Sequence, residues 1–97
     1  MRVIAYKKFR DAGVTHPEVA AQLELLYRDL KSNKFDNLNQ VKDHFPYVSI
    51  LKNNRVVFNV GGNKFRVVVH FVFTHQIVYV LFADTHAEYD KIDANSV

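Results

Sequence analysis

The fold that this sequence predicts is decided by residues 61–91, GGNKFRVVVHFVFTHQIVYVLFADTHAEYDK. After two glycines come two runs rich in β-branched and aromatic residues, 64–73 and 76–82, which are typical of neighbouring strands. His86 and Tyr89 follow the second run, where they would lie just past the end of a rigid sheet. Both side chains can transfer protons, so we expect this end of the sheet to hold reactive groups still.

Residues 55–60 predict the preceding strand, and Gly61 with Gly62 predicts a two-residue turn because both glycines accept positive φ. Such a turn would place Val60 opposite Asn63. Alternation along the strands sorts the side chains into two faces, of which we expect the more apolar one to meet the helices. That apolar face carries Val56, Phe58, Val60, Phe65, Val67, Val69, Phe71 and Phe73. The opposite, mixed face carries Arg55, Val57, Asn59, Lys64, Arg66, Val68 and His70.

The first half of the chain has helical periodicity. Residues 2–5 predict a short strand, and residues 6–12 a helix that Gly13 would end. Thr15 and Glu18 match a capping box, which predicts the start of a longer helix. The buried stripe of that helix would consist of Val19, Leu23, Leu26, Tyr27 and Leu30.

Shorter elements complete the expected fold. They are a helical turn within residues 35–44, a strand at 48–52, a turn at Asn53 and Asn54, and a C-terminal tail from Asp93 that frays. The whole pattern predicts an α+β fold, in which a short N-terminal strand and two helices pack on one face of a C-terminal antiparallel β-meander.

Composition restricts the class of protein. The 97 residues are 48% hydrophobic and 24% charged, which is typical of one globular domain spanning residues 1–97. The absence of cysteine excludes disulfides and thiolate chemistry. The longest apolar region, residues 67–83, is interrupted by polar side chains and cannot cross a bilayer as one helix. We therefore expect a cytoplasmic protein without a membrane partner.

Charge is distributed unevenly along the chain. The formal net charge is only +3, but no acidic residue occurs between Asp43 and Asp84. The cations in that interval are Lys52, Arg55, Lys64 and Arg66. A one-sided basic sheet suits a polyanion such as RNA. The alternative is that these cations discourage aggregation at the edge of the sheet.

Cleavage of RNA by its own 2′-hydroxyl needs a base, an acid and a cation that stabilises the charged phosphorane. Arg66 is suited to bind the phosphate, and His86 and Tyr89 to transfer protons or stack on a base. The residues expected to hold the RNA backbone are Arg55, Asn59, Asn63, Lys64 and Lys91. No metal-binding motif such as HExxH occurs, so we expect neither a metal nor another cofactor.

Each catalytic candidate has an alternative without chemistry. Arg66 would pair with a carboxylate of the C-terminal segment, His86 would be a surface or capping residue, and Tyr89 would be a hydrophobic lid. At the level of function, the alternatives are a non-catalytic RNA- or ribosome-binding module and a protein that only modulates a partner.

Three segments resemble the HigB toxin family of type II toxin–antitoxin systems. They are residues 54–68, 76–80 and 85–93, which read NRVVFNVGGNKFRVV, QIVYV and THAEYDKID. With the length and the N-terminal pattern, the resemblance covers nearly the whole chain. It implies a RelE-like fold and an mRNA interferase, an endoribonuclease that cuts translated mRNA on the ribosome without a metal and so inhibits translation.

The resemblance also implies a partner and a site. The partner is a helix-turn-helix antitoxin of the HigA type, which neutralises the toxin and through which the complex binds operator DNA. The wider RelE-like group has a basic residue on a central strand and His or Tyr near the C-terminus. Arg66, His86 and Tyr89 occupy similar places here.

Overall fold

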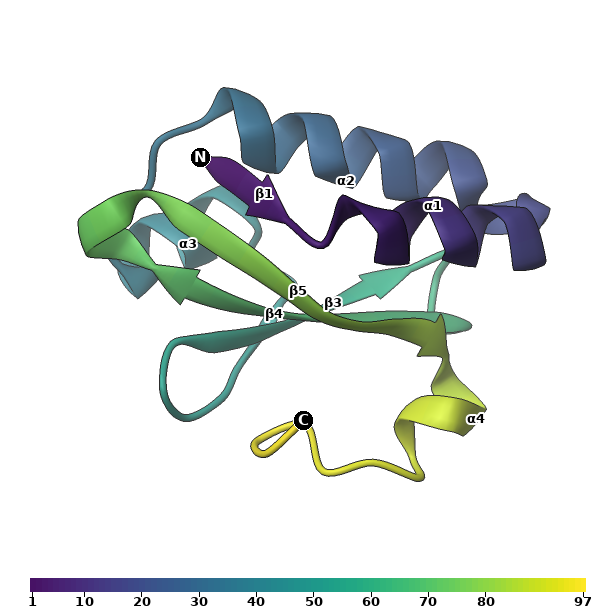
Figure 1. Ribbon diagram of the computed structural model, residues 1–97. Helices are drawn as coiled ribbons and strands as arrows, with labels where there is room; N and C mark the ends of the chain where they lie inside the picture. Colours follow the sequence, from purple (N-terminus) through teal and green to yellow (C-terminus); the bar gives the residue numbers. More distant parts are fainter.

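The computed structural model describes residues 1–97 as one mixed sheet with helices on both faces (Figure 1). The helices α1 and α2 lie on one face, and α4 with the C-terminal segment lies on the other. The elements are β1 (Arg2–Ile4), α1 (Tyr6–Thr15), the 3₁₀ turn η1 (Pro17–Val19), α2 (Ala20–Ser32), α3 (Leu38–His44), β2 (Ser49–Ile50), β3 (Arg55–Val60), β4 (Phe65–Val72), the 3₁₀ turn η2 (Phe73–His75), β5 (Ile77–Thr85) and α4 (His86–Tyr89). No helix has the length and apolar character needed to cross a membrane.

The sheet contains five strands in the order β1-β5-β4-β3-β2. Strands β2 to β5 form the expected antiparallel meander. The N-terminal strand β1 pairs in parallel with β5, with Ile4 opposite Tyr79. The α+β prediction is confirmed, and the parallel pairing of β1 makes the sheet mixed. Helices α1 to α3 carry the chain from β1 at this edge to β2 at the opposite one.

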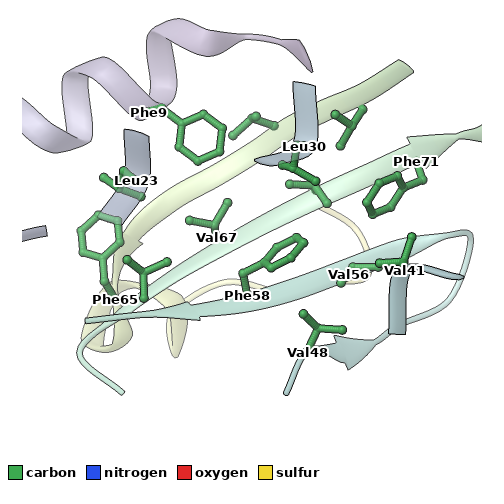
Figure 2. Packing of buried hydrophobic residues seen from close by; sticks show 14 of the residues in the cluster. Phe9, Leu23, Leu30, Val41, Val48, Val56, Phe58, Phe65, Val67 and Phe71 are labelled. Atoms are coloured by element: carbon green, nitrogen blue, oxygen red, sulfur yellow. The ribbon is translucent and has the colours of Figure 1, made fainter. Parts of the chain in front are cut away.

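The main hydrophobic core lies between the helices and the apolar face of the sheet (Figure 2). The expected helical stripe is confirmed, since Val19, Leu23 and Leu30 are buried and Leu26 and Tyr27 pack against them. The expected strand face is confirmed as well. Its buried members are Val56, Phe58, Val60, Phe65, Val67, Val69 and Phe71.

The turn between β3 and β4 is longer than predicted. Val60 lies opposite Phe65 and Asn59 opposite Arg66, so four residues connect the strands instead of two. Both glycines of the turn have positive φ, as expected. The pairing was wrong by two positions because the buried Val60 is matched with the buried Phe65 and not with the exposed Asn63. A shift of two residues keeps every side chain on its face, so the assignment of faces survives the error.

The ends of the first two helices also differ from the prediction. Gly13 lies inside α1, where a Cβ would come within 3.2 Å of the Ala20 Cβ, so this glycine serves close packing and does not end the helix. The predicted capping box does not form, because Thr15 is the last residue of α1 and no side chain caps η1. Pro17 begins η1, as its fixed φ favours.

The C-terminal tail was predicted to fray, and this was wrong. Ala94 is only 7% exposed and packs with Val57 and Val68 on the second face of the sheet. These two valines face away from the helices and would meet water without a cover. The tail supplies that cover, and the burial of apolar surface favours its packed position on the sheet.

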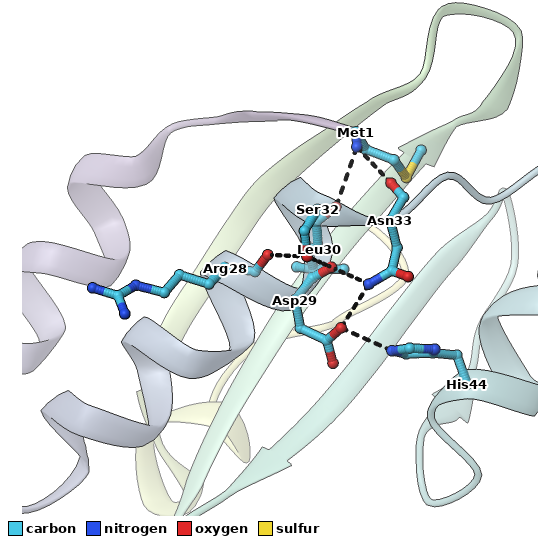
Figure 3. A network of polar contacts seen from close by, with 7 residues as sticks. All are labelled: Met1, Arg28, Asp29, Leu30, Ser32, Asn33 and His44. Carbon is cyan, nitrogen blue, oxygen red and sulfur yellow. Dashed lines mark hydrogen bonds and ion pairs between the residues drawn. The ribbon is translucent and has the colours of Figure 1, made fainter.

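Polar contacts connect β1, α2 and α3 on the helical side (Figure 3). The Met1 ammonium donates to the carbonyl oxygens of Leu30, Lys31 and Asn33 at 3.2, 3.0 and 2.6 Å. Burial lowers the pKa of this ammonium from its ordinary value. Asp29 lies 2.8 Å from His44 Nε2 and also accepts from Asn33 Nδ2. The carboxyl end of α2 is thereby joined to the first strand and to α3.

The core packing predicts a sharp contrast between two leucines of α2. Leu23→Ala is expected to lower the free energy of unfolding by about 2–5 kcal/mol, because the side chain is 1% exposed and its loss leaves a cavity. Leu25→Ala, at a side chain that is 65% exposed, should change it by less than about 0.5 kcal/mol. Urea unfolding followed by circular dichroism measures both, and equal losses would contradict the assignment of the buried stripe.

Candidate functional site

Arg66 lies near the start of β4, on the face that points away from α1 and α2. Its neighbours in the sheet are Asn59 on β3 and Asp84 on β5. Its Nη2 donates to Asn63 Oδ1 at 2.9 Å, and its guanidinium carbon lies 5.2 Å from the centre of the Tyr89 ring. The amide and the ring together hold the half-buried cation by one hydrogen bond and one cation–π contact.

No carboxylate pairs with Arg66. The acid opposite it in the ladder is Asp84, whose Oδ1 accepts from its neighbour Thr85 N at 2.7 Å and lies 3.5 Å from His16 Nε2. None of the ion pairs in the structure includes Arg66. Its Nε is buried and makes no hydrogen bond. The only side-chain hydrogen bond of Arg66 comes from Nη2, so Nη1, which is not buried, retains its donors for an external anion such as phosphate.

The helix α4 brings the Tyr89 ring against this cation and places His86 beside Tyr89. Thr85 caps the helix, its Oγ1 accepting from Glu88 N at 3.2 Å. His86 N donates to the Lys64 carbonyl oxygen at 2.9 Å, which attaches the start of α4 to the end of the β3–β4 turn. The His86 and Tyr89 ring centres are 6.4 Å apart. His86, Tyr89 and Arg66 thus form one cluster at the end of the sheet.

His86 has a carboxylate neighbour. Its Nε2 lies 3.3 Å from Asp90 Oδ1, one helical turn further along the chain. The imidazole side chain is 40% exposed, so a substrate can reach it. The Asp90 carboxylate is able to accept a hydrogen bond from the ring and so to orient it.

The structure brings most of the predicted RNA-binding residues to this cluster. Asn63 contacts Arg66, Lys64 bonds α4 through its carbonyl group, and Asn59 lies beside Arg66 in the ladder. All three side chains are exposed. Lys91 is exposed just past α4, where its ammonium pairs with Glu88 at 3.0 Å.

Arg55 does not join the cluster. It lies opposite His70, four residues along β4 from Arg66, which corresponds to about 13 Å at about 3.3 Å per residue. Its Nη1 donates to the carbonyl oxygens of Ala94 at 3.2 Å and Val97 at 2.7 Å. These contacts engage the guanidinium with the C-terminal segment.

Sequence reasoning missed Asp90 and the contact between Asp84 and His16. Asp90 could have been found from the sequence, because residues four positions apart, such as His86 and Asp90, lie on the same side of a helix. The other contact joins a residue at the start of η1 to one near the end of β5, and no local spacing predicts it.

The cluster is an open surface and not a pocket. A hollow of about 310 Å³ lies between α1 and β5, but Arg66, His86 and Tyr89 do not line it. No group of three or more His, Asp or Glu side chains is arranged to hold a metal ion. An exposed cluster of this kind is accessible to a long polymer, which an enclosed cavity would exclude.

Known proteins match this chain over the whole cluster. The family described as HigB_toxin, RelE-like toxic component of a toxin-antitoxin system, matches residues 19–92. The mRNA interferase HigB of Escherichia coli O6:H1 is 32% identical over 94 residues, which cover 95% of this chain and 91% of the relative. The mRNA interferase toxin HigB of Escherichia coli K12 and the mRNA interferase HigB of Shigella flexneri are each 34% identical over 96 residues, which cover 97% of this chain and 92% of each relative.

The free donors of Arg66 predict anion binding in solution. Titration with inorganic phosphate should shift the Nε–Hε resonance of Arg66 in a two-dimensional NMR spectrum, and Tyr89→Ala should reduce that shift by loosening the guanidinium. Arg28 provides the internal control, because it is 73% exposed and paired with Glu24 on α2. Equal shifts at the two arginines would mean that the cluster has no particular affinity for phosphate.

Proposed function

The chain belongs to the HigB family of RelE-like toxins, the toxic components of toxin–antitoxin systems, and from that premise we propose how it cleaves RNA. It is an mRNA interferase, an endoribonuclease that acts on messenger RNA. The proposal is that it cuts translated mRNA on the ribosome, with Arg66, His86 and Tyr89 as the catalytic residues.

The observation that carries this proposal is the unpaired state of Arg66. A half-buried guanidinium normally has a carboxylate partner, because an uncompensated charge is costly away from water. Here the carboxylate nearest in the ladder contacts His16, and the cation has only an amide and a ring. An RNA phosphate would supply the missing negative charge.

These positions support cleavage of RNA by its own 2′-hydroxyl. The 2′-hydroxyl oxygen attacks the adjacent phosphorus and loses its proton to a base, while the departing 5′-oxygen takes a proton from an acid. The products are a 2′,3′-cyclic phosphate and a free 5′-hydroxyl. Arg66 donates to the non-bridging oxygens as negative charge grows on them. His86, held by Asp90, makes one of these two proton transfers, and solvent water, which the open site admits, makes the other. The Tyr89 ring lies against the Arg66 guanidinium and holds it in place.

The open site supports a requirement for the ribosome. One histidine and one arginine do not by themselves enclose an RNA strand or align its 2′-hydroxyl with the leaving oxygen. Alignment contributes a large part of the rate in such reactions, and a ribosome holds mRNA in a defined path. Lys64, Lys91, Asn59 and Asn63 would contact the RNA backbone around the cleaved phosphate.

Membership of the family implies a cognate antitoxin. We propose that this antitoxin is a helix-turn-helix protein of the HigA type, that the complex binds operator DNA through it, and that the toxin acts in the cytoplasm. A short neighbouring gene encoding a helix-turn-helix protein would support this, and co-purification of the two products would test it.

Loss of the cation should abolish most of the activity. Arg66→Gln is expected to reduce mRNA cleavage by about 10²–10³-fold, because a preorganised donor to the transition-state charge is removed. His86→Ala should also lose cleavage, through loss of proton transfer. Primer extension on an mRNA in a purified translation system, with and without ribosomes, measures both.

Arg28→Gln is the matched control, because it removes the same charge from an exposed position on α2 and should cleave like the wild type. Cuts on free RNA would show that the ribosome is dispensable. If wild type makes no cut in either condition but binds RNA or ribosomes, the protein is the non-catalytic binding module.

The contact between Arg66 and the Tyr89 ring separates two roles for the tyrosine. Its hydroxyl makes no hydrogen bond in the structure, whereas its ring lies against the guanidinium. Tyr89→Phe should therefore retain most of the cleavage activity. Tyr89→Ala should lose more activity than Tyr89→Phe, because it removes the ring that lies against the guanidinium. The same primer-extension assay compares the two variants, and loss of activity in Tyr89→Phe would instead assign proton transfer to the hydroxyl.

A further inference from the structure

The C-terminal segment lies on the side of the sheet opposite α1 and α2 (Figure 1), which is the face that carries the candidate site. Ala94 lies in a small hydrophobic cluster with Val57 and Val68, which are opposite one another on β3 and β4. Val68 is two residues from Arg66 on the same face of β4. The ring of Tyr89 packs against this cluster, so the segment and the site share a set of contacts.

The helix α4 cannot hold its own position. It has four residues, His86 to Tyr89, and an isolated helix of that length is unstable in water. At its start, the bond from His86 N to the Lys64 carbonyl oxygen fixes it to the turn. At its other end, the helix is held by the Tyr89 ring, which lies near Arg66 and Phe82, and by the segment after Tyr89, whose Ala94 packs in the same cluster as that ring.

Arg55 fastens that segment. Its Nη1 donates to the carbonyl oxygens of Ala94 and Val97, at 3.2 and 2.7 Å. A second bond runs from Lys52 N to Asn95 Oδ1 at 3.3 Å. The guanidinium thus joins the first residue of β3 to a segment that follows α4, across 39 residues of sequence.

We propose that Arg55 is a positioning residue that sets the place of α4, and hence of Tyr89 and His86, by clamping the C-terminal segment onto the sheet. This inference rests on the proposed function. The charge of Arg55 made it a candidate for binding RNA, but its guanidinium binds backbone carbonyl groups of the protein itself. The guanidinium orders residues 93–97, Ala94 covers the two valines, and the cluster supports the Tyr89 ring under Arg66.

Loss of the clamp has a defined consequence. Without Arg55 the segment has fewer bonds, Ala94 leaves the valines and Tyr89 loses part of its support. The donors of Arg66 itself remain, so RNA or ribosome affinity is retained while the catalytic rate falls. Misplacement of catalytic groups by about 1 Å can cost about 10²-fold in rate, so we expect a decrease of about 10- to 100-fold in kcat with little change in KM.

The test uses two ways of releasing the segment and a matched control. Arg55→Gln removes the clamp, and Ala94→Lys places a charged chain at a site that is only 7% exposed and so expels the segment. Ser96→Lys is the control, because it adds the same charge at an exposed position of the same segment. The double variant of Arg55→Gln and Ala94→Lys completes a double-mutant cycle. If both substitutions act by releasing the same segment, the loss of kcat in the double variant should not exceed the loss in either single variant.

Two measurements are made on each protein. Hydrogen–deuterium exchange without RNA should show faster exchange at residues 86–97 in Arg55→Gln and Ala94→Lys, with the core strands and Ser96→Lys unchanged. Cleavage on the ribosome should lose kcat equally in the two single variants and in the double variant. Additive losses, a raised KM in Arg55→Gln, or unchanged exchange would overturn the proposal and return Arg55 to RNA binding.

Failure of the proposed function would look different. A wild-type protein that makes no cut refutes the catalytic assignment, and hydrogen–deuterium exchange still decides whether Arg55 holds α4 in place. Normal cleavage by Arg55→Gln, together with faster exchange at residues 86–97, would show that the clamp exists but does not position the site.

Discussion

The two-sided burial of β4 is the constraint on which the rest of the structure depends. This central strand alternates phenylalanine and valine side chains toward the helices with Arg66, Val68 and His70 toward the other face. The first set builds the main core, and the second places a cation and a valine on the face away from α1 and α2. Both the site and the cover beside it follow from this alternation.

The candidate site is assembled from three pieces that meet at one end of the sheet. β4 contributes the cation, the turn before it contributes the amide of Asn63, and the single-turn helix α4 contributes His86 and Tyr89. Asp84 would neutralise Arg66 if it turned toward it, but its carboxylate contacts His16 instead. The cation therefore keeps its affinity for an anion from outside, as a phosphate-cleaving site needs.

The candidate site has few chemical groups and does not enclose a substrate by itself. It has a charge to stabilise the transition state and one imidazole, on an open surface without a pocket around them. In the proposed mechanism the ribosome presents the RNA to this surface, and the C-terminal segment of the protein keeps α4 in place. The proposed clamp by Arg55 connects these requirements, because the residues that cover the second face also support the Tyr89 ring.

The sequence by itself determined the class of fold and the two faces of the sheet, and it supplied the candidate residues of the site. Side chains alternate between the two faces of a strand and recur about every 3.6 residues on one face of a helix. The spacing of apolar residues was therefore enough to assign Leu23, Phe65 and Arg66 to the correct faces. Even the error in the β3–β4 turn left the faces intact, since it amounted to two residues. Local signals failed at Gly13 and Thr15, where packing between α1 and the start of α2 overrode them.

Only the tertiary structure decided which charges are paired and which are free. Arg55 and Arg66 look alike in the sequence, yet one donates to the carbonyl groups of the C-terminal segment and the other lies unpaired over Tyr89. Asp84 contacts a histidine 68 positions earlier in the chain. Hydrogen bonds and ion pairs act over a few ångströms, and the distances that decide them are set by the folded chain and not by spacing along it.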